Sequence, residues 1–499
     1  MAVFTQHFPL AEHNIPTIPL NLFQTWHSRD MPTHMNECVE SLKRENPEFK
    51  HQLFDDQACR ELIRDKFPPD VLHAYDSLYP GAYKADLWRY CVLYVHGGIY
   101  LDIKLRCIPP FKLIKLATKE RYVRDREYHF NVGVYQACII SYPKNPILYD
   151  CIRTIVDYVR TLEYGDNVLF MGPMLMARHF DRSDILSWDM NFNGKEIRFG
   201  NTPIIGVYPQ FIKEFTDTSI TSYYMEAWAF RKAYKLLSLS PKKTNVLTRS
   251  FSTHSMTNIQ RISNVLYFQL TGEYVQENCM YFPSDKPVLL CKVNINDTYD
   301  FIGDVEYIGN PIKTSTVFSR GEDVYYVISD ADTYQLKGPT NLVLSAPFKC
   351  KSTEPLWAMV PYDDIHFVYE WYPLLLTRLV DNVLTPLQPN YDMPRFFKEL
   401  VAATHMVSFQ DQLWCILTKT HHFVFEHSFK RYAHLFVVFN QRMKLIKYSE
   451  FFMLGSPVSK ISDLHIDEQF TITYTTHNGR CFISEYSYDD IKNMRWTYQ

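Results

Sequence analysis

The segment 80–106 holds the side chains whose types and spacing are best suited to chemistry, PGAYKADLWRYCVLYVHGGIYLDIKLR. Asp86 and Arg89 are three residues apart, so on a helix they lie on one side, where they can pair or hold the hydroxyl groups of a ligand. Asp102 follows in an extended run, with Lys104 just beyond it. An ion pair on a helix surface is ordinary and contributes little by itself, so the case for function depends on the surrounding elements.

A helix and a strand must position these residues. The pattern over 81–95 predicts a helix with Asp86 and Arg89 on one side; the side chains expected to face the core are Leu87, Cys91 and Tyr94. The helix is expected to stop at Gly97-Gly98, the only glycine pair in the chain, because helix ends favour a positive φ that glycine adopts freely. The following run brings Asp102 to the carboxyl end of a strand, where open α/β sheets bind ligands.

The elements before this segment predict an α/β domain. Residues 32–45 form an amphipathic pattern with Pro32 suited to the first turn, and its apolar face consists of Met35, Cys38, Val39 and Leu42. A short strand near 49–54 and a helix near 56–66 follow. Alternating helices and strands of this kind are typical of a mostly parallel sheet.

The second half of the chain differs in character. Residues 238–257 are rich in Ser and Thr, which favours a linker between two domains and leaves a surface loop within one domain as the alternative. Beyond it, strand-like runs dominate, at 264–270, 324–328, 365–376, 412–418, 434–439 and 470–475. Asn478-Gly479 is a hairpin signal. We therefore predict domains at 1–237 and 261–499 with a linker at 238–260, the second being a β-propeller of about five blades or a large sandwich.

Composition excludes several classes of protein. The 499 residues include 52 Lys and Arg against 55 Asp and Glu, a net charge of -3 that argues against a nucleic-acid-binding surface. The aromatic content of 15% argues against disorder. The 11 cysteines form no C-x-x-C pair, which favours a reducing compartment. Neither a signal peptide nor a run of roughly 18 apolar residues is present, so we expect a soluble, cytoplasmic protein.

The first half resembles glycosyltransferase family 32, whose members share a "DXD" sugar-binding region. The central likeness is Ala85-Asp86-Leu-Trp-Arg89-Tyr90 followed by Gly97-Gly98-Ile-Tyr100-Leu-Asp102. The likeness covers roughly 14 to 235, and its outer parts are residues 18–27, 54–56, Asn131, 171–173 and 224–228. It resembles most the anchorless family members of large DNA viruses and bacteria, so the host cytoplasm or a virion is a further expected location.

The resemblance implies a GT-A type, retaining hexosyltransferase that uses a UDP- or GDP-sugar with Mn²⁺ or Mg²⁺ and a glycan acceptor. Asp86 and Arg89 would hold sugar hydroxyls, Asp102 would contact ribose or metal, and Lys104 would join them in catalysis. The residues expected to bind the donor are Gln24, Thr25, Trp26, Tyr100, Asn131 and Trp228. The alternative is a non-catalytic binder of glycans or nucleotide sugars.

This chain departs from the family motif because it reads Asp102-Ile103-Lys104. The exchange removes a metal ligand and adds a charge that attracts phosphate. Three outcomes are open: Lys104 replaces part of the metal's work, a metal persists on Asp102 with the phosphates, or the domain binds without turnover.

The second half bears a fainter likeness to five-bladed propellers of the mannoside phosphorylase and mannosyltransferase type. The residues behind this likeness are 357–374, Tyr432-Ala-His434 and Leu454-Gly455-Ser456. Its departures at 354–356 and 399–403 argue against phosphorolysis. Three roles are open for the second half of the chain: a second transferase or glycosidase site using Asp363, Asp364 or Glu370, a glycan-binding module, or a scaffold.

Overall fold

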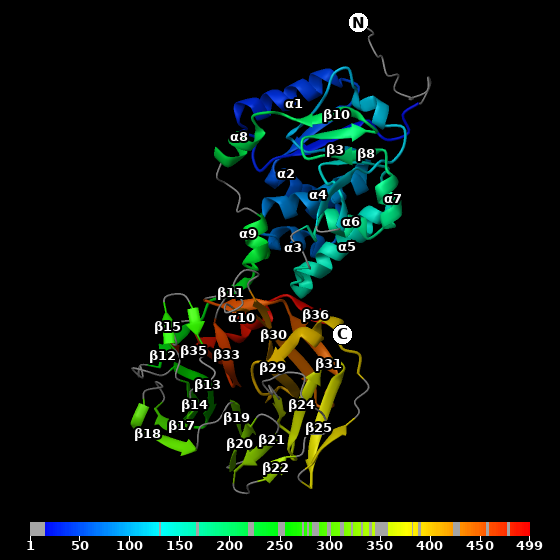
Figure 1. The fold of residues 1–499 in the computed structure, drawn as a ribbon. Helices are drawn as coiled ribbons and strands as arrows, with labels where there is room; N and C mark the ends of the chain where they lie inside the picture. Colours follow the sequence, from blue (N-terminus) through cyan, green and yellow to red (C-terminus); the bar gives the residue numbers. More distant parts are fainter. Residues whose placement is uncertain are drawn as a thin grey trace. The chain divides into compact units, whose positions relative to one another are not determined.

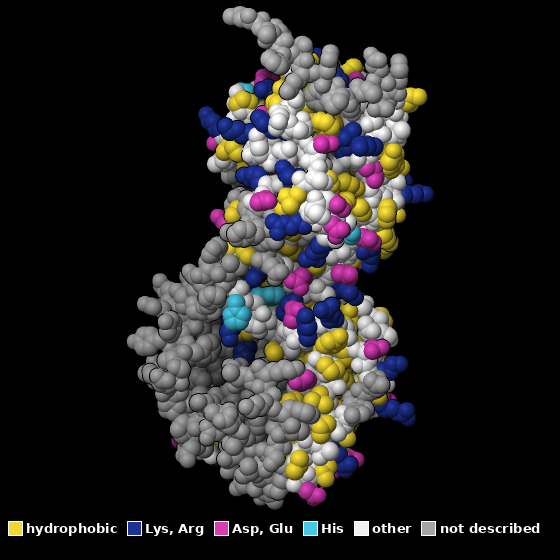
Figure 2. Space-filling model, turned by 45° about the vertical axis from the view of Figure 1, so that its right-hand side comes forward, with side chains coloured by type: hydrophobic (Ala, Val, Ile, Leu, Met, Phe, Trp, Pro, Cys, Tyr) yellow, Lys and Arg dark blue, Asp and Glu magenta, His cyan; other side chains and the backbone are white. Residues whose placement is uncertain are grey.

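The computed structural model divides into two compact units, Met1–Lys235 and Leu236–Gln499 (Figure 1). It describes residues 15–499 except 129–130, 166–168, 218–223, 248–254, 272–273, 277–278, 282–288, 297–300, 310–313, 321–322, 331–332, 339–341, 345–357, 382, 388–390, 423–429, 456–458 and 477–479. On the face drawn in Figure 2, Lys and Arg side chains lie among Asp and Glu side chains on the described parts of both units.

The first unit is built on a four-stranded sheet. Its strands, in order, are β2 (Lys50–Phe54), β1 (Asn21–Thr25), β3 (Gly98–Leu101) and β7 (Cys138–Ser141). β1 pairs in parallel with β2 and β3, and β7 is the antiparallel edge. The predicted parallel sheet is therefore present, but small.

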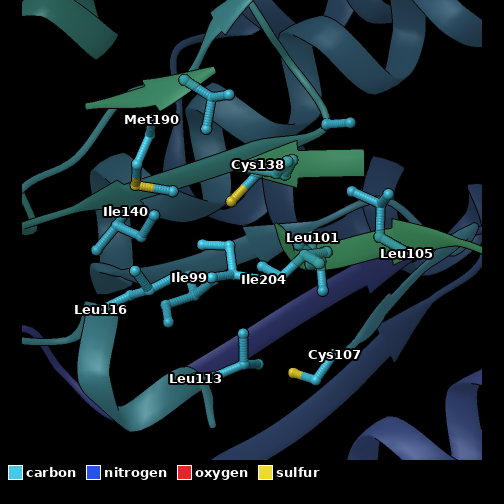
Figure 3. Close-up of a cluster of buried hydrophobic side chains, with 14 of the residues drawn as sticks. Ile99, Leu101, Leu105, Cys107, Leu113, Leu116, Cys138, Ile140, Met190 and Ile204 are labelled. Atoms are coloured by element: carbon cyan, nitrogen blue, oxygen red, sulfur yellow. The ribbon is translucent and has the colours of Figure 1, made fainter. Parts of the chain in front are cut away.

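A six-stranded, mostly antiparallel sheet lies beside it. Its strands, in order, are β4 (Leu105–Cys107), β10 (Thr202–Val207), β9 (Glu196–Phe199), β8 (Met190–Phe192), β5 (Arg124–Tyr128) and β6 (Asn131–Val134). One core cluster joins residues of both sheets, among them Ile99, Ile140, Met190 and Ile204 (Figure 3). This shared core connects β3, which precedes Asp102, to strands from much later in the chain.

The three helices predicted for this unit, at 32–45, 56–66 and 81–95, are present within one residue of those bounds. The helices of the unit are α1 (Thr33–Glu45), α2 (Asp56–Lys66), α3 (Pro69–Ser77), α4 (Gly81–His96), α5 (Pro146–Thr161), α6 (Pro173–Ala177), α7 (Arg182–Ser187), α8 (Phe211–Asp217) and α9 (Tyr224–Ala229), with a 3₁₀ turn at Leu113–Leu116. α1 buries Met35, Cys38, Val39 and Leu42, the apolar face predicted from its spacing. The side chain of Asp55 accepts a hydrogen bond from the Ala58 amide and so caps α2.

α4 differs from its prediction in one respect. Asp86, Arg89, Tyr90 and Leu93 are buried together with Leu87 and Cys91, whereas Tyr94 is only partly buried. The expected division into a polar and a core face is therefore wrong. The reason is that α4 is enclosed by packing from several elements, including α2, α5, β3 and β1, so its polar residues lie inside the fold.

The second unit consists mostly of strands. The largest sheet has the order β11 (Leu237–Leu239), β32 (Phe452–Leu454), β30 (Lys430–Asn440), β29 (Gln412–His422) and β27 (Leu400–Ala402), and β28 (Val407–Phe409), β31 (Leu445–Ser449) and β36 (Trp496–Tyr498) also belong to it. Two four-stranded sheets have the orders β12 (Lys243–Val246), β35 (Cys481–Tyr486), β34 (Phe470–Thr475), β33 (Lys460–Ile466) and β13 (Ser255–Ile262), β14 (Val265–Thr271), β17 (Leu289–Ile295), β18 (Phe301–Gly309), and β15 (Tyr274–Gln276) pairs with β16 (Cys279–Tyr281). Two further four-stranded sheets have the orders β19 (Thr314–Arg320), β20 (Asp323–Asp330), β21 (Thr333–Lys337), β22 (Leu342–Leu344) and β23 (Ala358–Val360), β24 (His366–Trp371), β25 (Leu374–Val380), β26 (Val383–Leu387). A 3₁₀ turn at Arg395–Glu399 and α10 (Tyr488–Lys492) complete it.

Two sequence expectations for this unit are corrected. The run 365–376 is not one strand but β24 and β25, which pair antiparallel across Tyr372 and Pro373. In the range predicted as a linker, 238–260, β12 and most of β11 form and pair with strands from the C-terminal part of the unit, because a Thr-containing polar run also suits a sheet edge. β34 and β35 pair as the predicted hairpin, while its Asn478-Gly479 turn and residues 354–356 lie outside the described residues.

Candidate active site

The first unit contains an open cavity of about 750 Å³. Asp86 and Arg89 of α4 line it, as do Asp102 and Lys104 from the turn after β3. The four residues predicted to act in catalysis therefore share one cavity, although two come from a helix and two from a loop. Gly97 and Gly98 make this possible: their φ angles of 61° and 127° turn the chain sharply from α4 into β3.

Asp86 and Arg89 form a buried ion pair. Asp86 Oδ1 lies 2.7 Å from Arg89 Nη1, and the two residues are only 7% and 5% exposed. Burial raises the pKa of Asp86 to about 6, even though Arg89 acts in the opposite direction. An ordinary ion pair on a helix surface would be exposed to solvent. Asp86 and Arg89 are buried, so they do not form such a surface pair.

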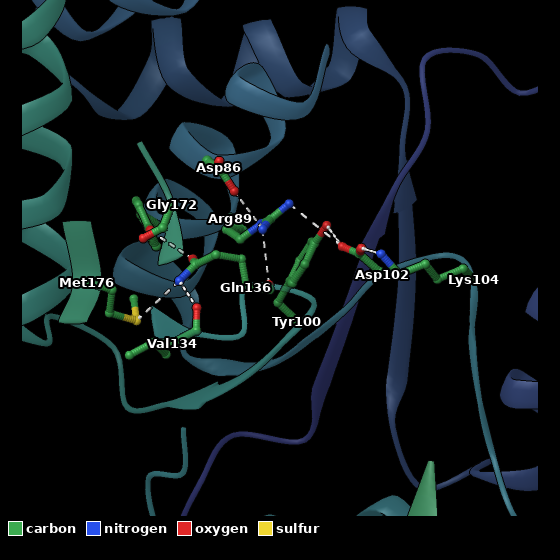
Figure 4. Close-up of polar contacts among 10 residues, drawn as sticks. Asp86, Arg89, Tyr100, Asp102, Lys104, Val134, Gln136, Gly172 and Met176 are labelled. Carbon is green, nitrogen blue, oxygen red and sulfur yellow. Dashed lines mark hydrogen bonds and ion pairs between the residues drawn. The ribbon is translucent and has the colours of Figure 1, made fainter. Parts of the chain in front are cut away.

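Arg89 and Tyr100 connect this pair to Asp102 (Figure 4). Arg89 Nη2 lies 3.7 Å from Asp102 Oδ1, and the guanidinium carbon is 4.6 Å from the centre of the Tyr100 ring. Tyr100 donates a hydrogen bond of 2.7 Å to the same oxygen of Asp102. Burial by itself would raise the pKa of Asp102, but Lys104 and Arg89, with the Tyr100 hydrogen bond, hold it at about 2. Asp102 is therefore ionised at any ordinary pH.

Lys104 completes the network on the other side of Asp102. Its Nζ lies 2.7 Å from Asp102 Oδ2 and 5.8 Å from the ring centres of both Tyr135 and Phe211. The ammonium is therefore held in a defined place at the cavity wall.

The described residues do not fit a divalent cation on Asp102. Mg²⁺ and Mn²⁺ prefer several oxygen ligands, but one oxygen of Asp102 faces the Lys104 ammonium and the other accepts from Tyr100. In the part of the chain that the structure describes, no group of three or more His, Cys, Asp or Glu side chains could hold a metal ion. The predicted Mn²⁺ or Mg²⁺ would therefore have to share Asp102 with Lys104 and Tyr100.

Gly172 and Gln136 keep the network in place. The Tyr90 hydroxyl donates to Gln136 Oε1 at 2.7 Å, and Gln136 Nε2 donates to the Val134 carbonyl. The Gln136 carbonyl in turn accepts from Arg89 Nη1 at 3.1 Å. Gly172 lies so close to Asp86 that a Cβ there would be 2.6 Å from its carboxylate. This close approach explains why the loop before α6 carries a glycine.

Three of the residues predicted to bind the donor, Gln24, Thr25 and Trp26, lie on or just after β1 and do not line the cavity. Gln24 is buried beneath the site: its Nε2 donates to the Asp102 carbonyl at 3.5 Å, and its Oε1 lies 2.9 Å from His51 Nε2. Thr25 donates to the Phe54 carbonyl. Among the described residues, the buried indole Nε1 of Trp26 has no hydrogen-bond partner.

The other residues predicted to bind the donor lie in different places relative to the cavity. Tyr100 belongs to the network, as described above. Trp228 does not line the cavity; its Nε1 donates to the Tyr164 carbonyl at 2.6 Å and its ring faces the Arg231 guanidinium. The Asn131 backbone pairs with Tyr128 in the β5–β6 ladder, and its side chain lies outside what the structure describes.

The cavity also has lining residues that the sequence interpretation missed. They are contributed by β5, by the region around β8 and β9 and by the segment after β6, and include Asp125, Arg126, Tyr135, Phe192 and Lys195. The Tyr135 and Phe192 rings stack with centres 3.9 Å apart. Burial raises the pKa of Asp125. No motif marks these residues, because they reach the cavity through the six-stranded sheet.

The segment that contains α4, β3 and Asp102 matches the model of a known protein family. Residues 32–121 match the family model "Glycosyltransferase sugar-binding region containing DXD motif". The resemblance carried by α4, β3 and Asp102 is thereby confirmed, because all of these lie within the matched segment.

Similar proteins with curated descriptions include several glycosyltransferases. An uncharacterised glycosyltransferase of Acanthamoeba polyphaga mimivirus is 34% identical over 92 residues, which are 18% of this chain and 37% of that protein. The initiation-specific α-1,6-mannosyltransferase of Candida albicans is 33% identical over 91 residues, 17% of this chain and 24% of its own length. An inositol phosphoceramide mannosyltransferase of Schizosaccharomyces pombe is 34% identical over 90 residues, 18% and 25%. The chain thus spans well under half the length of these relatives.

Two solved structures show distant likeness. The PaToxG glycosyltransferase covers 34% of this chain and 73% of its own, at 18% identity and a TM-score of 0.26. MPT-1, a GDP-Man-dependent mannosyltransferase from Leishmania mexicana, covers 52% and 94%, at 8% identity and a TM-score of 0.36. Both scores are low. Within the described residues, no helix has the length and apolar character needed to cross a membrane.

Proposed function

We propose that this protein is a retaining hexosyltransferase that moves a sugar from a nucleotide diphosphate to a hydroxyl group of a glycan acceptor. The observation that carries the proposal is the series of ion pairs that joins the buried Asp86 and Arg89 to Asp102 at the wall of one cavity, inside the segment that matches the sugar-binding family. The non-catalytic alternative is not favoured, since the similar proteins are transferases.

The chemistry follows from the charges at the cavity. A carboxylate such as Asp86 accepts hydrogen bonds from sugar hydroxyls, and Arg89 keeps that carboxylate oriented. The leaving diphosphate gains negative charge as the bond to the sugar breaks, so cations placed beforehand stabilise the transition state. Lys104, Arg126 and Lys195 line the same cavity and can supply this charge.

For the second unit we propose a five-bladed propeller that binds the acceptor glycan or serves as a scaffold. Repeated four-stranded antiparallel sheets support it, and so does β12, an early strand that pairs with the late strand β35 as in ring closure. Among the acids considered for a second active site, Asp364 pairs with Arg378 at the surface and Asp363 is exposed. Neither has the buried environment of Asp86.

The test is hydrolysis and transfer of UDP- and GDP-hexoses by the purified protein. Asp86→Ala and Asp102→Ala are expected to abolish sugar-nucleotide hydrolysis, because each removes a carboxylate of the network. Asp150→Ala, an exposed acid on α5, is the matched control and should leave hydrolysis unchanged. Unchanged hydrolysis in both site variants would refute the assignment of this cavity.

A further inference from the structure

Lys104 stands where the matched family's Asp-x-Asp motif has its second acid. Its ammonium is 2.7 Å from Asp102 Oδ2, while Asp102 Oδ1 accepts from Tyr100 and lies 3.7 Å from Arg89. Both oxygens of the one remaining acid of the motif therefore already face positively charged or hydrogen-donating groups.

A divalent cation on this carboxylate would be surrounded by like charge. It would bind the oxygens that now face Lys104 and Arg89, and both cations lie within 4 Å of the carboxylate. Like charges at such distances repel strongly in a buried site. The described residues supply no further cluster of acids that would compensate.

The Lys104 ammonium is well placed to contact phosphate. Its side chain is 24% exposed and lines the cavity, with the ring centres of Tyr135 and Phe211 each 5.8 Å from the ammonium. An ammonium has three N–H donors. Asp102 can accept from one of them, which leaves donors for the oxygens of a ligand in the cavity.

We infer that the Lys104 ammonium, held by Asp102, takes the place of a divalent cation and binds the donor's diphosphate directly, so that transfer needs no metal ion. This inference rests on the proposed function, because it requires a diphosphate donor. In the transfer, the bond between the anomeric carbon and the phosphate oxygen breaks with its electron pair on that oxygen. The acceptor oxygen bonds to the anomeric carbon, its proton passes to the phosphate, and Lys104 stabilises the charge that develops.

Isothermal titration with GDP and UDP, in EDTA and in Mn²⁺, tests the inference. The wild-type protein is expected to bind one of them with the same affinity, within about twofold, in both conditions. Lys104→Asp restores the Asp-x-Asp motif and should reverse this behaviour: binding should fall at least about tenfold in EDTA and return in Mn²⁺. Turnover of the corresponding sugar nucleotide should follow the same pattern.

Two further variants guard against a folding artefact. Lys104→Arg keeps a cation and should keep binding in EDTA, whereas Arg106→Gln changes an exposed cation outside the cavity and should have no effect. Wild-type binding that is lost in EDTA and restored by Mn²⁺ would overturn the inference and leave the proposed function intact. If the protein neither binds nor hydrolyses the nucleotides in EDTA and also does not do so in Mn²⁺, the proposed function itself is overturned.

Discussion

Gly172 packs directly against the carboxylate of Asp86: a Cβ at position 172 would lie 2.6 Å from Asp86 Oδ2. A side chain at this position would push the carboxylate away from Arg89, to which it is paired at 2.7 Å. A residue on the loop before α6 thereby determines the orientation of an acid on α4. This relationship gives a first prediction that leaves every charged residue in place.

Gly172→Ala is expected to lower kcat/KM for the sugar nucleotide by at least about tenfold, since small displacements of positioning groups are costly. Overpacking of this kind costs about 1–3 kcal/mol of stability, so the protein should still fold. Gly206→Ala in β10 is the control, because its Cβ would make only an ordinary contact with Ile108 at 3.4 Å. Equal activity of the two variants would mean that the position of Asp86 is not critical.

Activity should depend on pH through Asp86. Burial raises its pKa from 3.8 to about 6, so the ionised form needed to accept sugar hydroxyls is lost as the pH falls below about 6. The folded state binds this proton more tightly than the unfolded state, so between about pH 4 and 6 the contribution of Asp86 to stability decreases as the pH rises. The measurement is the acid limb of kcat/KM in the wild-type protein.

Asp125 also lines the cavity and has a raised pKa, so a matched variant assigns that limb. Asp125→Asn should retain an acid limb near pH 6 if Asp86 is responsible. Loss of the limb in Asp125→Asn would transfer the assignment to Asp125.

The ion pair between Asp86 and Arg89 should show strong coupling in unfolding experiments. Arg89→Ala leaves the buried Asp86 carboxylate without its closest cation and is expected to cost about 3–5 kcal/mol. The double variant Asp86→Ala with Arg89→Ala should be less destabilised than the single Arg89 variant, because no unpaired charge remains. Urea denaturation of the four proteins in this cycle measures the coupling, and additive effects would contradict it.

Trp228 is predicted to stabilise the fold rather than bind the donor. Its indole donates to the Tyr164 carbonyl and lies outside the cavity lining. Trp228→Phe should therefore lower the free energy of unfolding by about 1–3 kcal/mol and leave the affinity for GDP and UDP unchanged. A loss of nucleotide affinity with unchanged stability would restore the sequence-based expectation that Trp228 binds the donor.

The sequence by itself determined the local elements and the centre of the site. The spacing of Met35, Cys38, Val39 and Leu42 predicts the buried face of α1, and Gly97-Gly98 predicts the end of α4, because periodicity and positive φ are properties of neighbouring residues. The same locality explains why Asp86, Arg89, Asp102 and Lys104 could be proposed together.

Only the tertiary structure decided what surrounds them. Asp125 and Lys195 reach the cavity through β5 and the turn before β9, and Trp26 and Trp228 are placed outside it. It also paired both oxygens of Asp102 with donors, and the inference of metal-free transfer rests on this pairing. These facts depend on the pairing of strands that are far apart in the chain, and such pairing is set by the packing of the whole core, not by the spacing of residues within one segment.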